Sequence, residues 1–192
     1  YYFGIVGKYG AQVQALLKKL PVLISRTICP LHGPVLNENL DFYLNLYQTW
    51  SAYEPEDKGV LIAYTSVYGN TKKAAELLAQ MLVDKGCEKV AITDLARDDI
   101  AEAVEDAFRY DRLVLATTTY NGDVFPFMRE FIESLTERNY QKRTIGLIEN
   151  GSWAATAAKV MRQLFEKSKE ITFTETTVKI MSALNERKYN TA

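Results

Sequence analysis

Three short segments combine glycine with hydroxyl, amide and aromatic side chains in a way that suits a phosphate and a flat ring. The first runs directly into a helical pattern, and its candidate ligand-binding residues are Ser66, Val67, Tyr68, Gly69, Asn70 and Thr71. A helix N-terminus presents unpaired backbone N–H groups and a partial positive charge. The segment therefore predicts a cradle for a single phosphate, with an ordinary capped turn as the alternative.

Two known phosphate motifs are absent from this first segment. It does not contain G-x-x-x-x-G-K-[ST], so a nucleoside triphosphate with Mg²⁺ is not favoured. It does not contain G-x-G-x-x-G either, so a dinucleotide is not favoured. The segment therefore favours a ligand with a single terminal phosphate over these two ligand classes.

The other two segments bring aromatic rings. The candidate residues of the second are Thr118, Thr119, Tyr120, Asn121 and Gly122, and those of the third are Asn150, Gly151, Ser152 and Trp153. Tyr120 could stack on a flat heteroaromatic ligand and Trp153 could cover its other face or edge. Asn121-Gly122 readily adopts positive φ. The alternatives are an ordinary turn for the second segment and a Trp153 packed on a neighbouring helix.

The hydrophobic pattern places all three segments at the ends of expected strands. It predicts strands over 60–64, 89–93, 113–117, 144–148 and 171–180, and helices over 71–85, 98–108, 128–137 and 154–167. Continuous apolar strands that alternate with helices are typical of a parallel sheet covered on both faces. We expect an α/β fold with a doubly wound five-stranded sheet, whose ligands bind beyond the carboxyl ends of the strands.

The first 57 residues form a separate, α-rich appendage in this interpretation. The pattern predicts a helix over 11–20, a strand-like segment over 22–29, a turn over 30–34 and a helix capped by Asn37. These residues contain too few apolar strands for a core of their own. The polar stretch 54–59 suggests a boundary between domains 1–57 and 58–192.

Composition excludes several classes of function. The chain has 192 residues, a net charge of -1 and no apolar run that could span a bilayer. We therefore expect neither a nucleic-acid nor a membrane partner. Cys29 and Cys87 lie in separate segments and form no C-x-x-C pair, which favours a reduced, cytoplasmic protein.

The three segments together resemble the flavodoxin-like domain of flavodiiron proteins. The resemblance implies that 58–192 is a flavodoxin-like domain that binds FMN, and that 1–57 is the C-terminal end of a metallo-β-lactamase-like domain. His32 would correspond to the last iron ligand of that domain. The remaining ligands of the family are absent from this sequence, so we expect no metal site here. Thr118 stands where the family commonly has proline.

The resemblance also implies a redox function. FMN would pass electrons from a rubredoxin-like or flavin reductase donor towards a di-iron O₂ or NO reductase centre that this chain lacks. We expect no catalytic nucleophile or base, because flavin electron transfer needs none. The alternative is a stand-alone FMN oxidoreductase such as a quinone reductase. The family pairs head to tail, and the choice between a monomer and a homodimer stays open.

Overall fold

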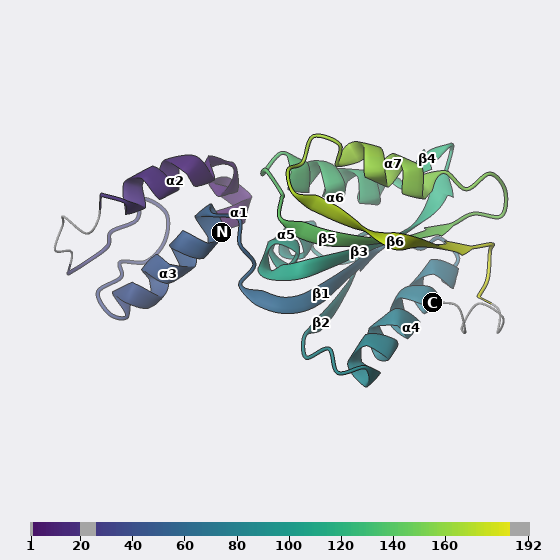
Figure 1. Ribbon diagram of the computed structural model, residues 1–192, viewed down its shortest axis with the longest axis horizontal. Coiled ribbons are helices and arrows are strands. Elements are labelled where there is room, and N and C mark those ends of the chain that lie inside the picture. Colours follow the sequence, from purple (N-terminus) through teal and green to yellow (C-terminus); the bar gives the residue numbers. More distant parts are fainter. Residues whose placement is uncertain (1, 20–25, 185–192) are drawn as a thin grey trace.

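The computed structural model describes residues 2–19 and 26–184, and its centre is a twisted, mainly parallel sheet (Figure 1). The parallel strands are β1 (Asp57–Tyr64), β2 (Val90–Asp94), β3 (Tyr110–Tyr120), β5 (Arg143–Asn150) and β6 (Ile171–Ile180). Their order is β2-β1-β3-β5-β6, and every neighbouring pair on this path is parallel. The predicted doubly wound five-stranded sheet is confirmed.

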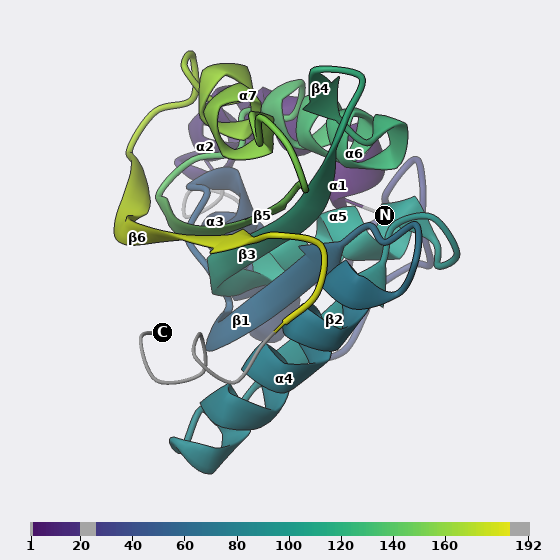
Figure 2. The same cartoon turned by 90° about the vertical axis from the view of Figure 1, so that its right-hand side faces the viewer.

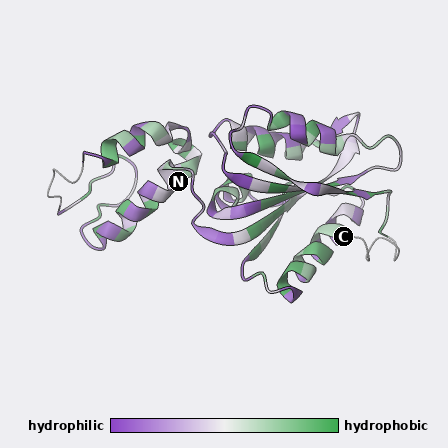
Figure 3. Cartoon of the chain, in the orientation of Figure 1, coloured by the Kyte–Doolittle hydropathy of each residue, from purple (hydrophilic) through white to green (hydrophobic). Residues whose placement is uncertain are grey.

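Helices cover both faces of the sheet (Figure 2). They are α4 (Asn70–Asp84), α5 (Ile100–Arg109), α6 (Pro126–Thr136) and α7 (Ala157–Leu164). Because side chains alternate along a strand, Leu61 and Ala63 of β1 pack with α5, α6 and α7, whereas Val60 and Ile62 pack with α4. Figure 3 shows hydrophobic residues along α4 and the strands beside it.

Most element boundaries differ from the sequence prediction by one to three residues, and one strand of the sheet was not predicted. β1 begins at Asp57 rather than at 60, because Asp57 pairs with Tyr110 of β3 and extends the ladder. The last helix begins at Ala157 rather than at 154, after Ala154 adopts a left-handed φ of 40°. The short strand β4 (Asp123–Val124) pairs antiparallel with β3 and was not predicted.

The N-terminal residues form the two predicted helices, with different boundaries, and two further short helices that were not predicted. The predicted helices are α2 (Gly10–Leu17) and α3 (Leu40–Ser51), and the further ones are α1 (Tyr2–Ile5) and the 3-10 helix η1 (Gly7–Tyr9). The prediction that Asn37 caps α3 is wrong. Asn39 occupies that position, with a left-handed φ of 51° and no side-chain hydrogen bond to the helix.

The strand-like segment predicted over 22–29 lies partly outside the described residues. Residues 20–25 lie outside the described part of the chain, and residues 26–29 contribute a single antiparallel bridge, from Ile28 to Leu36. The predicted turn over 30–34 lies between these two residues, and its Gly33 has a φ of 126°. The turn thus brings the two ends of the bridge together.

The N-terminal helices lie beside the sheet, at the end opposite the carboxyl ends of the strands (Figure 1). Tyr2 and Phe3 are buried in the same core cluster as the inner residues of α5 and α6. The ring of Phe3 stacks on that of Phe108, with centroids 4.1 Å apart. The N-terminal segment therefore shares the core of the sheet domain.

Candidate functional site

The three predicted segments meet at the carboxyl ends of β1, β3 and β5 and surround a cavity of about 190 Å³, which we call the cradle. Its lining residues are Ser66, Val67, Tyr68, Asn70, Thr71, Thr118, Asn150, Gly151, Ser152 and Ser182. Nine of these ten are residues that the sequence pointed to, and Ser182 is not. Gly69, Thr119, Tyr120, Asn121, Gly122 and Trp153 do not line the cradle.

The start of α4 leaves polar groups available to a ligand in the cradle. Gly69 precedes the helix with a φ of 83°, and no side chain caps the first turn. The Oγ atom of Ser66 is buried and has no hydrogen-bond partner within the described part of the chain. A buried hydroxyl without a partner is costly unless a ligand satisfies it. Together with an uncapped helix N-terminus, it fits the oxygens of a phosphate group.

Two buried threonines, Thr65 and Thr117, lie next to the cradle at the ends of its strands. The hydroxyls of Thr65 and Thr117 lie 2.6 Å apart and join the ends of β1 and β3. Beside them, Thr118 donates a hydrogen bond of 3.2 Å to the carbonyl oxygen of Asn150, which joins β3 to β5. These contacts hold the first, second and third segments at fixed positions relative to one another.

Tyr64 ends β1 immediately before the first segment. Its side chain is buried beside the carboxylate of Asp94, and burial followed by that negative charge raises the pKa of the Tyr64 phenol to about 12. Arg97 Nη1 lies 2.8 Å from the Asp94 carboxylate. Tyr64 is therefore a neutral, buried support for the loop at ordinary pH.

The aromatic residues lie outside the cradle. Tyr120 is half exposed, packs edge to face on Phe125 with centroids 5.3 Å apart, and lines a second cavity of about 340 Å³ together with Asn121. Trp153 is 89% exposed, so the alternative in which it packs on a neighbouring helix does not hold. That Tyr120 and Trp153 enclose a ring stays a prediction.

Asn121 and Gly122 form the turn between β3 and β4. Their φ values are 54° and 77°, which confirms the positive φ expected of this pair. Two contacts fix the position of this turn. The Thr156 hydroxyl donates to the Gly122 carbonyl at 3.2 Å, and Arg129 donates to both carboxylate oxygens of Asp123. The arginine holds the pKa of Asp123 below its usual range.

Two polar side chains near the cradle, those of Thr119 and Glu149, accept hydrogen bonds from the start of α7. The hydroxyl of Thr119 accepts hydrogen bonds from the backbone nitrogens of Thr156 and Ala157, at 3.0 and 3.2 Å. Buried Glu149 accepts a bond of 2.9 Å from the backbone nitrogen of Ala158. Both side chains thus accept hydrogen bonds from backbone N–H groups that have no partner within the helix. Thr119 therefore connects the end of β3 to the start of α7, and its contact with a ligand stays a prediction.

Neither a metal centre nor a membrane span is found in the described residues. Across 2–19 and 26–184, no three His, Cys, Asp or Glu side chains come together in a way that could hold a metal ion. Within the same residues, each helix is too short or too polar to cross a bilayer. His32 lies in the bend of the N-terminal segment.

Comparison with known proteins agrees with this geometry. Residues 61–192 match the flavodoxin domain family. The chain is 27% identical over 160 residues to the putative diflavin flavoprotein A 4 of a Nostoc species, which covers 82% of this chain and 28% of that protein.

Two solved structures share the fold over the whole chain. Rubredoxin oxygen:oxidoreductase from Desulfovibrio gigas has a TM-score of 0.90 at 20% identity, over 100% of this chain and 48% of that one. The flavodiiron protein from Giardia intestinalis has a TM-score of 0.90 at 18% identity, over 100% of this chain and 47% of that one. The chain thus spans about half the length of these solved proteins.

The matched family region contains almost all of the parallel sheet, the three segments and every residue that lines the cradle. The chain therefore belongs to the flavodoxin domain family, and its fold corresponds to the flavodoxin-like half of flavodiiron proteins.

Proposed function

We propose that this chain is an FMN-binding electron-transfer domain. The observation that carries the proposal is the cradle, in which the partnerless Ser66 hydroxyl lies beside the uncapped start of α4. A single phosphate ester satisfies both features. Membership of the flavodoxin domain family supports FMN as the compound that bears it.

The phosphate is assigned to the first segment. Backbone N–H groups at the start of α4 would donate to it, and the Ser66 and Thr71 hydroxyls would add side-chain hydrogen bonds. Gly69 keeps the left-handed backbone that turns the chain into the helix. When bound, FMN supplies the redox chemistry, and the protein supplies binding, orientation and exclusion of water.

The ring is assigned to the second and third segments. Tyr120 and Trp153 expose apolar surface at the same edge of the sheet, and the turn at Asn121 and Gly122 presents backbone polar groups there. These residues would lie against the ring and shield part of it from water. Their exposure supports the assignment, because much of the surface of Tyr120 and most of that of Trp153 is open to a ligand.

In the proposed electron path, both the electron donor and the electron acceptor are separate from this chain. Rubredoxin oxygen:oxidoreductase and the flavodiiron protein, by name, connect this fold with rubredoxin, oxygen and a di-iron centre. We propose, on this basis, a rubredoxin-like or flavin reductase donor and a di-iron acceptor that reduces O₂ or NO. The acceptor would lie outside residues 1–192.

Titration of the protein with FMN and with riboflavin tests the proposal. After removal of any bound flavin, we expect FMN to bind and its fluorescence to be quenched, and riboflavin, which lacks the phosphate, to bind more weakly. Ser66→Ala should weaken FMN binding about tenfold and leave riboflavin binding unchanged, because a hydrogen bond to a charged group is lost.

Ser168→Ala is the matched control, since Ser168 lies in the turn that leads from α7 to β6 and does not line the cradle. It should bind both flavins as the wild-type protein does. A wild-type protein that stays colourless and ignores FMN at saturating concentration would overturn the proposal.

A further inference from the structure

A fourth segment, which no sequence motif indicates, forms part of the cradle. It is the short stretch after β6, and its Ser182 lines the same cavity as Ser66 and Thr71. Ser182 follows the carboxyl end of β6 just as the other segments follow β1, β3 and β5. The parallel arrangement therefore brings it to the same edge of the sheet.

The Asn150 side chain holds this segment in place. Its Nδ2 donates 3.1 Å to the Ser182 carbonyl, and its Oδ1 accepts 3.1 Å from the Ser182 backbone nitrogen. The same Nδ2 also donates 3.3 Å to the Thr71 hydroxyl at the start of α4. The Asn150 amide thus joins β5, α4 and the segment after β6.

This use of the amide leaves Asn150 little capacity to bind a ligand. A carboxamide has two N–H donors, and both are taken by Thr71 and Ser182. Its oxygen already accepts from the Ser182 backbone, and the side chain is buried. Asn150 was expected to contact the cofactor directly, but its contacts are those of a brace between segments.

The Ser182 side chain, in contrast, is available. The residue is exposed, and its hydroxyl makes no hydrogen bond within 2–19 and 26–184. Its backbone has a φ of 67°, an unusual conformation for serine, and both of its backbone polar groups are bonded by Asn150. The residue is therefore held in a defined position at a cavity that also contains the partnerless Ser66 hydroxyl.

We propose that Ser182 is a phosphate ligand of this site, contributed by the segment after the last strand, and that Asn150 is the positioning residue that holds it there. The inference rests on the proposed function, because it takes the phosphate in the cradle to be that of FMN. It adds a ligand from a fourth segment to the three that the sequence pointed to.

A double-mutant cycle on FMN affinity tests both parts. Ser182→Ala should weaken FMN binding about tenfold and leave riboflavin binding unchanged, because only the phosphate contact is lost. Asn150→Ala should weaken FMN binding at least as much. In the Asn150→Ala background, Ser182→Ala should have little further effect, because the serine is already released.

Hydrogen exchange of the protein without flavin gives a readout independent of binding. Asn150→Ala should speed exchange at the Ser182 amide, whereas Ser182→Ala should not, since its backbone bonds remain. Ser168→Ala again serves as the control for both measurements. If Asn150→Ala does not fold, the Ser182→Ala titration alone decides.

The outcomes separate this inference from the proposed function. Wild-type protein that binds FMN, with unchanged affinity in Ser182→Ala, overturns the inference and leaves the proposed function standing. Strictly additive effects in the cycle overturn the positioning role of Asn150. If the wild type binds neither FMN nor inorganic phosphate, as judged by thermal stabilisation, both proposals fail. If phosphate stabilises the wild type but FMN does not, and Ser182→Ala abolishes this stabilisation, Ser182 is a phosphate ligand and the proposal that the site binds FMN fails.

Discussion

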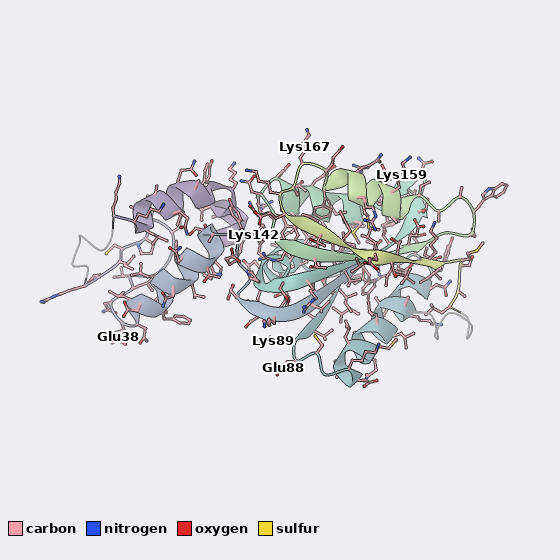
Figure 4. All side chains as sticks on the ribbon, in the orientation of Figure 1. Glu38, Glu88, Lys89, Lys142, Lys159 and Lys167 are labelled. Carbon is pink, nitrogen blue, oxygen red and sulfur yellow. The ribbon has the colours of Figure 1, made fainter. Side chains whose placement is uncertain are left out.

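Arg143 Nη1 donates a hydrogen bond of 2.7 Å to the carbonyl oxygen of Tyr53, and so ties the end of the N-terminal segment to β5. The same buried guanidinium donates to the Phe108 carbonyl at 2.6 Å and to the Tyr110 carbonyl at 2.8 Å. Next to it, Lys142 lies at the junction of the two parts (Figure 4) and donates to the Ala52 carbonyl at 3.0 Å. This junction is far from the cradle, so its effects can be measured separately.

Arg143→Met should lower the free energy of unfolding by about 3 kcal/mol, because it leaves several buried carbonyl groups without donors. Urea denaturation measures the loss. Arg112→Met is the matched control, because the Arg112 side chain is 55% exposed and forms a surface ion pair with Asp111. It should change the stability by less than about 1 kcal/mol. Equal losses in the two variants would contradict a special role for Arg143.

Gly69→Ala should both destabilise the protein and impair FMN binding. Gly69 has a φ of 83° with open space where a Cβ atom would stand, so the cost of about 1 kcal/mol arises from the left-handed backbone. Gly86→Ala is closely matched, with a φ of 85° and equally open space at the other end of α4.

The two glycine variants should lose similar stability in urea denaturation. Only Gly69→Ala should also weaken FMN binding, because only Gly69 lies next to the cradle. A loss of FMN affinity of the same size in Gly86→Ala would show that general destabilisation, and not the loop, is responsible.

The stability of the protein should fall above pH 10 partly through Tyr64. Its folded-state pKa is raised from 10.0 to about 12, so the unfolded chain releases the phenol proton first. The stabilisation is complete below pH 10 and is lost as the pH rises towards 12. Tyr64→Phe should therefore show a shallower fall in unfolding free energy across this window.

Urea denaturation at a series of alkaline pH values measures this effect. Part of the pH dependence should remain in Tyr64→Phe, because burial also raises the pKa values of Tyr2 and Tyr140. A slope that is identical in the wild type and in Tyr64→Phe would refute the contribution of Tyr64.

Arg129→Met should raise the pKa of the Asp123 carboxyl towards its ordinary value. Arg129 donates to both carboxylate oxygens, at 2.7 and 2.6 Å, and favours the charged form. Because the folded-state pKa is depressed, Asp123 stabilises the protein above its unfolded pKa, and this contribution is lost as the pH falls. NMR titration of the carboxyl group measures the shift. Arg97→Met, which removes the partner of Asp94 instead, should leave Asp123 unchanged.

The inner residues of α6 illustrate what could be predicted from sequence. Met128, Phe131, Ile132 and Leu135 recur at helical spacing and are all fully buried. Helical periodicity and strand patterns are properties of short stretches of sequence, so the order of the main strands and helices could be predicted from them. The positive φ of Asn121 and Gly122 could also be predicted, because the residue type restricts the local backbone conformation.

The roles of Asn150, Thr119 and Ser182 show what the sequence left open. Nothing near Asn150 indicates that its amide binds Ser182, which lies 32 positions further along the chain. Thr119 similarly satisfies backbone donors of α7 that are 37 and 38 positions away. These partners meet only because β3, β5 and β6 end at one edge of the sheet.

The sequence by itself determined the order along the chain of the parallel strands and of the helices between them, which glycines turn the chain and which loops carry hydroxyl, amide and aromatic side chains. These follow from interactions between near neighbours. Only the tertiary structure decided that the N-terminal helices share the core through Phe3 and Phe108, and that a fourth segment reaches the cradle. Those contacts join residues distant in sequence, whose meeting depends on strand order and on the packing of the whole sheet.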